Sequence, residues 1–314
     1  MRVYAGVDGG GSKTTCAVSD ESGRILGRAT TGPSNYSALG IDVAAERVAE
    51  AIRSALCDAA LGAAPPQFAG ICLALAGVAR PDDHRTWRTA LAGLMDGGSV
   101  RAQWDTTAED AVITHDAMAA LVGGTGRRQG VVVIAGTGAI AFGVSARGDE
   151  RRASGWGYLL GDEGSGYWIG LQALRAVCRA DDGRDDPTAL TAAVLDAKGL
   201  TRPQDLVRPM YSDWKPVDVA ALAPVVFQVA AAGDITARGI VDQAATELAD
   251  AACAVLHGLA LEHAEVVTSG GLWTGSSHLA DLFSDHVRQR CAATVIAPRD
   301  EPVAGALLLA RGLA

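Results

Sequence analysis

Residues 4–18 read YAGVDGGGSKTTCAV. An apolar run ends in Asp8, three glycines follow, and residues 12–15 open a second run typical of a strand. The pattern predicts a strand-turn-strand unit that binds phosphate, because Gly9, Gly10 and Gly11 permit positive φ and let successive N–H groups surround an anion. Asp8 then lies where a nucleotide's metal would be. A turn that leads into a strand fits neither a P-loop nor a dinucleotide-binding GxGxxG motif. The alternative is a glycine-rich hairpin with a solvated aspartate.

The same design recurs later in the chain. Residues 130–143 read GVVVIAGTGAIAFG, so a β-branched run leads through Gly136, Thr137 and Gly138 into a second apolar run. A third strand-like run, VVTSGGL at 266–272, ends in another glycine turn. A repeated hairpin indicates two duplicated domains, and two such domains facing a cleft would hold nucleotide phosphates from opposite sides.

Composition is consistent with a two-domain enzyme. The chain has 314 residues, 49% of them hydrophobic, enough to fill two cores. Its net charge of −9 argues against a nucleic-acid partner, which selects a basic face. No secretory leader pattern and no apolar run of ~18 residues is visible, so we expect no membrane partner and a cytoplasmic protein.

Cysteine and histidine patterns point away from a built-in transition metal. The six cysteines form no CxxC pair, and we expect buried reduced thiols rather than disulfides or a zinc site. The six histidines show no HxxxH or HExxH spacing.

Periodicity predicts an α/β fold of two duplicated ribonuclease-H-like domains with a cleft between them. We expect the first domain at 1–117 and the second at 118–314, with a helical insertion at about 181–233 and a closing helix at about 302–314 that packs near the first domain. Expected strands lie near 2–8, 13–19, 24–30, 69–75, 110–114, 130–135, 139–145, 265–269 and 293–297. Expected helices lie near 41–60, 164–180, 235–262 and 277–290.

Six motifs together resemble the BadF/BadG-type ATPase family, and within it the N-acetylglucosamine kinase branch. They are DGGGSKT at 8–14, HDA at 115–117, IAGTGA at 134–139, GWGYLLGDEGSGYWIG at 155–170, SGG at 269–271 and PVAGAL at 302–307. The resemblance covers nearly the whole chain. It implies the actin-like ATPase fold, ATP as the nucleotide and an amino sugar as the acceptor.

A sugar kinase needs a base for the attacking hydroxyl, and Asp116 is the candidate. It follows an apolar run and precedes a helix-like segment, at the position of the family's catalytic aspartate. His115 stands where asparagine is common in the family. The alternative role for Asp116 is an N-cap of the following helix, and Asp110 is the second candidate base.

The resemblance also assigns the nucleotide site. Asp8 would hold Mg²⁺, since that ion is bound through few carboxylates and keeps several waters. Lys13 could equally face solvent and is not assigned. The expected ATP-binding residues are Gly10, Gly11 and Ser12 on one side, Thr137 and Gly138 on the other, and Gly270 and Gly271 as the turn facing adenosine.

The acceptor site rests on Asn35, Asp162, Gly138 and Gly155. Asn35 and Asp162 match residues with which the family binds sugar hydroxyls, while the two glycines allow close approach. An N-cap for the next helix is the alternative for Asp162 and its neighbour Glu163. Tyr36-Ser37 replaces a His-Trp pair of some members, and Ala139 replaces the usual serine, which bears on the sugar's 2-substituent.

The aromatic residues near the acceptor motif have two interpretations. Trp156, Tyr158, Tyr167 and Trp168 could form a platform that stacks on a sugar. For Tyr167 and Trp168 we favour packing in an interdomain core.

Three functions are compatible with these motifs. The first is an ATP-dependent kinase acting on the 6-hydroxyl of N-acetylglucosamine, or else of glucosamine, N-acetylmuramate or a range of hexoses. The second is an iron–sulfur ATPase that activates a radical dehydratase, but no cysteine lies at 117–165 where that role would need one. The third is a sugar-sensing regulator, for which no DNA-binding segment precedes the first strand. A homodimer is left open.

Overall fold

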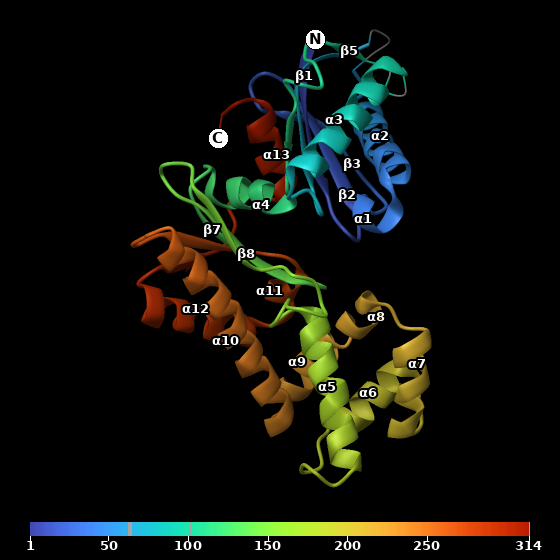
Figure 1. Ribbon diagram of the computed structural model, residues 1–314, viewed down its shortest axis with the longest axis vertical. Coiled ribbons are helices and arrows are strands. Elements are labelled where there is room, and N and C mark those ends of the chain that lie inside the picture. The colour runs from blue at the N-terminus through green and yellow to red at the C-terminus, as the bar shows by residue number, and fades with distance from the viewer. Residues whose placement is uncertain (62–64, 99, 101, 314) are drawn as a thin grey trace. The chain divides into compact units, whose positions relative to one another are not determined.

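The computed structural model describes residues 1–61, 65–98, 100 and 102–313. The chain forms two compact units (Figure 1). Unit 1 comprises Met1–Gln129 and Pro298–Ala314, and unit 2 comprises Gly130–Ala297. The division therefore falls later than the 117/118 boundary expected from the sequence.

Unit 1 is built on a mixed sheet. Its strands are β1 (Arg2–Gly9), β2 (Thr14–Ser19), β3 (Ile25–Thr31), β4 (Gln67–Leu75), β5 (Gln103–Trp104) and β6 (Val112–Thr114). They lie in the order β3-β2-β1-β4-β5, with β6 also paired to β4. The first three strands are antiparallel, whereas β4 runs parallel to β1, β5 and β6.

Five helices belong to unit 1. They are α1 (Tyr36–Leu39), α2 (Ile41–Asp58), α3 (Pro81–Asp96), α4 (Asp116–Thr125) and α13 (Pro302–Ala310). In α2, Val48, Ile52 and Ala55 recur at helical spacing and are completely buried against the sheet. The sequence pattern did not predict helix α3, although Trp87 and Leu91 lie about one turn apart and are fully buried.

Helix α13 explains why the C-terminal segment belongs to unit 1. It packs on β1 and α4 with backbone against backbone, because a Cβ at Gly305 would lie 2.1 Å from the carbonyl oxygen of Ala119. On the other side, a Cβ at Gly6 would lie 2.5 Å from the amide nitrogen of Leu307. Since α4 is held by α13, it joins unit 1 rather than the following sheet.

Unit 2 repeats the topology of unit 1. Its strands are β7 (Gly130–Ala135), β8 (Ala139–Val144), β9 (Glu150–Ser154), β10 (Glu265–Ser269) and β11 (Thr294–Ile296). The order β9-β8-β7-β10-β11 has the same antiparallel and parallel pairings as β3-β2-β1-β4-β5. The predicted duplication of an α/β domain is therefore confirmed.

The helices of unit 2 surround one large apolar core. They are α5 (Gly166–Asp181), α6 (Leu190–Lys198), the short 3₁₀ helix η1 (Pro203–Leu206), α7 (Val207–Ser212), α8 (Pro216–Ala220), α9 (Ala223–Ala231), α10 (Ile235–Gly258), α11 (Gly271–Gly275) and α12 (Ser277–Cys291). Segments α6 to α9 form the expected helical insertion, and Leu190 and Leu222 anchor it in the core.

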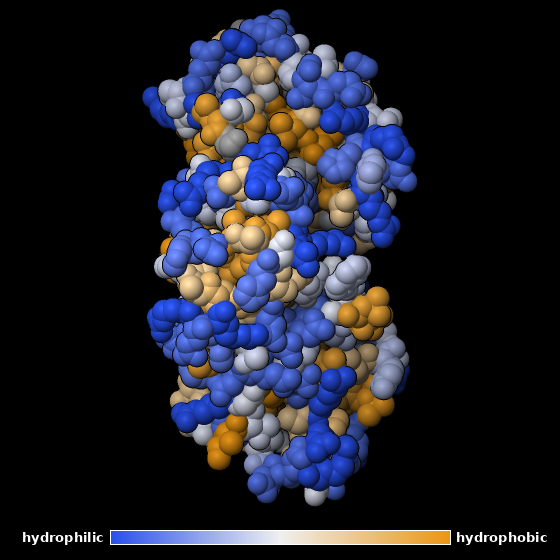
Figure 2. All heavy atoms as spheres, turned by 60° about the vertical axis from the view of Figure 1, so that its left-hand side comes forward, coloured by the Kyte–Doolittle hydropathy of each residue, from blue (hydrophilic) through white to orange (hydrophobic). Residues whose placement is uncertain are grey.

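Among the described residues, no single helix is long and apolar enough to span a bilayer; α8–α9 and α10 pass that test only as a pair bent by 120°. The face drawn in Figure 2 is largely hydrophilic, and its apolar areas form separate patches.

One expectation about the cysteines is wrong. Cys253 of α10 and Cys291 at the end of α12 form a disulfide with a Cα–Cα distance of 6.1 Å. The two helices pack along each other, which brings together two residues 38 positions apart. The other four cysteines are free thiols, buried at positions 16 and 72 and exposed at 57 and 178.

Candidate active site

The β1–β2 turn of unit 1 carries the first group of predicted phosphate ligands. The N–H of Gly10 donates to the carbonyl oxygen of Lys13 at 2.8 Å, and the carbonyl of Gly10 accepts from the N–H of Ser34 at 3.1 Å. Gly11 and Ser12 form the exposed tip of the turn. The turn therefore uses the N–H of Gly10 internally and leaves Gly11 and Ser12 in contact with solvent.

The expected role of positive φ in this turn is wrong. Gly9, Gly10 and Gly11 all have backbone angles outside the left-handed region. Glycine is required at position 9 for space, because a Cβ there would lie 2.3 Å from Ser34 Oγ and 2.4 Å from Leu75 Cδ2. The turn is thus shaped by close packing of the next loop rather than by a nest of left-handed glycines.

Sheet register brings Asp8 and Asp116 together. Asp8 pairs with Ala74 of β4, and Ala74 pairs with Thr114 of β6, two residues before Asp116. Burial is the main cause that raises the pKa of Asp8 to about 7; the negative charge of Asp116 contributes in the same direction, and Lys13 opposes it. Burial likewise raises the pKa of Asp116, against the opposing effect of His115. Two partly buried carboxylates that interact and have raised pKa values are typical of a functional site.

The helix that follows is capped by His115, not by Asp116. His115 Nδ1 accepts from the N–H of Met118 at 3.3 Å, and Asp116 is the first residue of α4. Asp116 Oδ1 accepts from the N–H of Ala117 at 2.9 Å. The N-cap alternative for Asp116 is therefore wrong. Asp110, the second candidate base, is exposed and accepts from Thr107 Oγ1 at 2.7 Å.

Asn35 lies in the loop that contacts the β1–β2 turn through the bond from Ser34 to Gly10. It is the N-cap of α1, and its Oδ1 accepts from the N–H of Ser37 at 3.1 Å. Because the cap occupies the side-chain oxygen, the amide NH₂ is the group that can donate to a ligand.

The β7–β8 turn carries the corresponding residues of unit 2. The N–H of Gly136 donates to the carbonyl of Gly138 at 2.9 Å, and the carbonyl of Thr137 accepts from the N–H of Tyr167 at 3.1 Å. The turn is therefore tied to the first turn of α5, with Thr137 exposed at its tip. A Cβ at Gly138 would lie 2.5 Å from Asp162 Oδ2, so these two residues are close neighbours.

Asp162 is the most constrained residue of the 155–164 loop. It is 8% exposed and has a φ of 59°, which is unusual for a residue other than glycine. Its Oδ1 accepts from the N–H of Gly157 at 3.1 Å. Burial raises the pKa of this carboxyl, and the charge of Glu163 adds to the effect. Backbone strain around a buried carboxylate is a common feature of ligand-binding sites.

Neighbouring groups show which residue caps α5 and why position 155 is a glycine. Ser165 caps α5 by accepting from the N–H of Trp168 at 3.2 Å, so neither Asp162 nor Glu163 is the N-cap. Gly155 has a φ of 71°, and a Cβ there would lie 2.8 Å from Ile140 Cδ1, so the position requires glycine on both counts.

The four aromatic residues of this segment differ in burial. Tyr167 is 7% exposed in the core of unit 2 itself, and Trp168 packs against that core, so the expectation of an interdomain core is wrong for this pair. Trp156 and Tyr158 are exposed by 64% and 43%.

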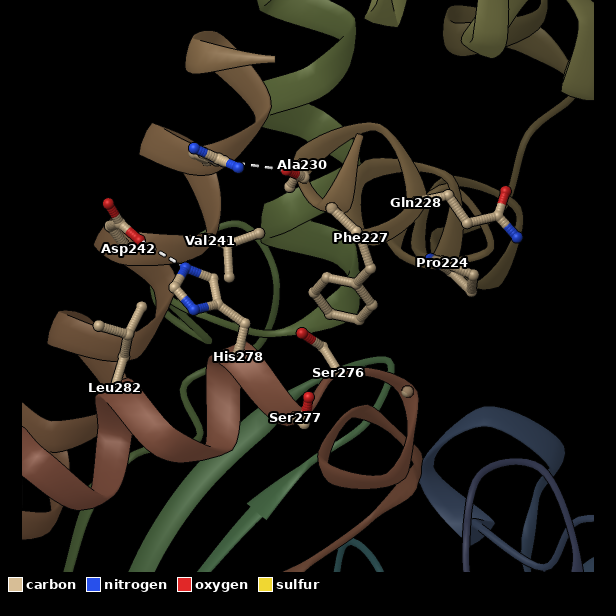
Figure 3. Close-up of a pocket in the computed structure, with 13 residues that line it drawn as sticks. Pro224, Phe227, Gln228, Ala230, Val241, Asp242, Ser276, Ser277, His278 and Leu282 are labelled. Carbon is tan, nitrogen blue, oxygen red and sulfur yellow. Dashed lines mark hydrogen bonds and ion pairs between the residues drawn. The ribbon is translucent and has the colours of Figure 1, made fainter. Parts of the chain in front are cut away.

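The segment that follows the third glycine turn lines a pocket that the sequence pattern did not predict. Gly270 has a φ of 102°, and a Cβ there would lie 2.4 Å from the carbonyl oxygen of Ala135. After Gly270 and Gly271, the chain continues through α11 to Gly275, which lines a pocket of about 620 Å³ (Figure 3). The close-up shows Phe227 and Val241 on its wall and the His278–Asp242 pair, with Nε2 and Oδ1 3.3 Å apart. The only sequence signal was the GSS segment four residues after the glycine turn.

The residues present fit a magnesium ion that arrives with a nucleotide. No group of three or more potential metal ligands exists among the residues that the structure describes. Mg²⁺ in phosphoryl-transfer sites is bound by one or two carboxylates together with phosphates and waters. Asp8 beside Asp116 supplies such a donor set, and a cation would relieve their mutual repulsion.

A family model described as the BadF/BadG/BcrA/BcrD ATPase family matches residues 5–310. The chain belongs to this family. It is 33% identical over 325 residues to the N-acetyl-D-glucosamine kinase of Dictyostelium discoideum, covering 98% of this chain and 97% of that protein. It is 31% identical over 315 residues to the N-acetylmuramic acid/N-acetylglucosamine kinase of Clostridium acetobutylicum, covering 99% of both.

A solved structure supports the fold of this BadF/BadG/BcrA/BcrD member. A candidate N-acetylglucosamine kinase from Chromobacterium violaceum is 32% identical, with a TM-score of 0.76 over 98% of this chain and 99% of that one. The predicted actin-like architecture of duplicated domains is thereby confirmed.

Proposed function

We propose that this protein transfers the γ-phosphoryl group of ATP to the 6-hydroxyl of an amino sugar, with N-acetylglucosamine as the first candidate. The observation that carries the proposal is the pair formed by Asp8 and Asp116. Strand pairing across β4 brings these two carboxylates together, and each has a raised pKa. The pair is what a kinase needs where a hydroxyl is deprotonated beside a metal-bound phosphate.

Asp116 is the proposed general base. Its carboxylate would accept the proton of the sugar 6-hydroxyl. The oxygen of that hydroxyl would attack the γ-phosphorus, and ADP would depart. A pKa raised by burial makes the carboxylate a stronger base than an exposed aspartate.

Asp8 is the proposed metal-binding carboxylate. Mg²⁺, when bound, would neutralise charge on the transferring phosphates. The N–H groups of Gly11 and Ser12 would donate to phosphate oxygens, with Gly10 shaping the turn. Thr137 and Gly138, in the corresponding turn of unit 2, are the phosphate-binding residues proposed for that unit. Backbone donors suit this task because they need no reorganisation during the reaction.

The sugar acceptor would be bound by both hydrogen-bond donors and hydrogen-bond acceptors. In unit 1, the amide NH₂ of Asn35 is the proposed donor to a sugar hydroxyl. In unit 2, Asp162 would accept from sugar hydroxyls, which would compensate its burial. Gly138 and Gly155 leave room for the sugar ring, and the close contact between Gly138 and Asp162 supports a shared acceptor site.

The pocket beside Gly275 is the proposed site of the nucleotide base. Its first lining residue after the turn of Gly270 and Gly271 is Gly275, four residues further along the chain, and its wall combines apolar side chains such as Phe227 with polar ones such as Ser277. Ser277→Trp would fill part of this space and raise the KM for ATP without raising the acceptor KM. Ser212→Trp, at an exposed position on α7 outside the pocket, is the matched control.

An ADP-release assay tests the proposed reaction. Purified protein is mixed with ATP, Mg²⁺ and one sugar at a time: N-acetylglucosamine, N-acetylmuramic acid, glucosamine and glucose. We expect release that depends on an amino sugar, with the 6-phosphate identified by mass spectrometry. Release that is the same with and without any sugar would refute the proposal, and bound iron in that protein would favour the ATPase-activator alternative.

A further inference from the structure

Tyr36 is attached to α3 through both its ring and its hydroxyl. The hydroxyl donates to Asp83 Oδ1. The ring meets Trp87 edge-on, with centroids 6.2 Å apart and an interplanar angle of 83°. Asp83 and Trp87 lie about one turn apart on the same helix, so a single face of α3 holds the whole side chain.

Asp83 is itself held firmly. Its Oδ2 accepts from the N–H of Ala79 at 2.9 Å and from the N–H of Arg80 at 2.7 Å, just before α3 begins. Burial tends to raise the pKa of Asp83, but the bonds from Tyr36 and the two N–H groups outweigh it, and the pKa lies below the ordinary value. Trp87 is fully buried in the core of unit 1, so α3 is a rigid support.

Ser34 before Asn35 is fully buried, but the segment after Asn35 has little packing of its own. Helix α1 has only four residues, and none of them is buried. A second contact with the segment before α3 comes from Gly77, where a Cβ would lie 3.0 Å from Asn35 Oδ1 and 3.1 Å from Ser37 Oγ. The position of the Asn35 side chain therefore depends on contacts with residues 77–87.

We propose that the Tyr36–Asp83 hydrogen bond fixes the Asn35 loop for acceptor binding, so that Tyr36 and Asp83 are positioning residues. The inference rests on the proposed function for its acceptor. Because Tyr36 is the next residue after Asn35, holding its ring and hydroxyl limits the directions in which the Asn35 amide can point. Without the bond the amide samples several orientations, and acceptor binding must select one of them.

Steady-state kinetics of Tyr36→Phe, Asp83→Asn and the double variant test this role. We expect the acceptor KM of each to rise about three- to tenfold, the scale of one hydrogen bond, with the ATP KM and kcat changed less than about twofold. The double variant should be no worse than the more impaired single variant, because once Tyr36 has lost its hydroxyl the change at Asp83 has no such bond left to weaken. Tyr211→Phe, at an 87% exposed tyrosine of α7, is the matched control.

Hydrogen exchange gives a readout that needs no turnover. In Tyr36→Phe, amides of residues 35–40 should exchange faster, whereas those of β1 and β4 should not change. Unchanged exchange at 35–40 would overturn the proposal, as would equal rises in the KM for sugar and ATP, or faster exchange with an unchanged acceptor KM. If the unaltered protein releases no sugar-dependent ADP, the proposed function fails separately, and the exchange experiment still decides whether the bond holds the loop.

Discussion

Asp8 and Thr114 lie at the same level of the unit 1 sheet, since both pair with Ala74 of β4. The chain passes from Thr114 through His115 to Asp116 and enters α4 there. Strand register thus places a carboxylate from the first strand beside one from the start of a distant helix, and the charge of Asp116 contributes to the raised pKa of Asp8.

Removing the proposed base should abolish most turnover while leaving nucleotide binding intact. We expect Asp116→Asn to lower kcat by about two to four orders of magnitude, the usual contribution of a positioned base, with the Kd for ATP nearly unchanged. Asp110→Asn is the matched control, because Asp110 is exposed and bonded to Thr107. Near-normal turnover by Asp116→Asn would remove the residue from the mechanism.

Two substitutions of Asn35 distinguish its role in capping α1 from its proposed role in acceptor binding. Asn35→Ala should raise the acceptor KM more than the ATP KM, because the contact we propose is to the sugar alone. Asn35→Asp keeps a capping oxygen but loses the NH₂ donor, so it should reproduce the kinetic defect with a smaller loss of thermal stability. The assignment would fail if both KM values rose equally.

Gly138 tests the shared site with Asp162. A Cβ at this position would lie 2.5 Å from Asp162 Oδ2, so Gly138→Ala should displace the carboxylate and raise the acceptor KM. Gly136→Ala is a close control, since a Cβ there has nothing within 4 Å. Equal kinetics for the two variants would argue against the contact.

Acid should weaken unit 2 through Asp234, the N-cap of α10. Burial tends to raise its pKa, but bonds from the N–H groups of Ala237 and Ala189 and from Thr188 outweigh it, and the folded-state pKa is depressed. The stabilisation is therefore complete above the unfolded-state pKa and is lost as pH falls through the folded-state pKa. Asp234→Ala should cost about 1 kcal/mol in the free energy of unfolding at neutral pH and less in acid. A pH-independent difference in urea unfolding would contradict this.

Thiol counting tests the disulfide. The unfolded, unreduced protein should expose the four free thiols of residues 16, 57, 72 and 178, and reduction should add those of Cys253 and Cys291. Cys253→Ser should lower the free energy of unfolding by about 2–4 kcal/mol under oxidising conditions, whereas Cys57→Ser should have little effect. Six reactive thiols without reduction would show that the bond is not formed.

Local patterns were sufficient to predict the repeated hairpin. Residues 4–18 and 130–143 each carry β-branched or apolar runs around a glycine turn, and period and turn chemistry act over a few neighbouring residues. The same local signals predicted α2, α10 and α12, and with the family resemblance they led to Asp8, Asn35, Asp116 and Asp162.

Long-range packing was beyond such patterns. The partnership of Cys253 with Cys291, the pocket beside Gly275 and the bond from Tyr36 to Asp83 each join segments whose separation in sequence carries no periodic signal. Even in the β1–β2 turn, glycine at position 9 is explained by the approach of Ser34 and Leu75 rather than by its own backbone angle. A sequence specifies which groups are available, but which of them touch depends on how strands register and helices cross, and that is settled only when the whole core packs.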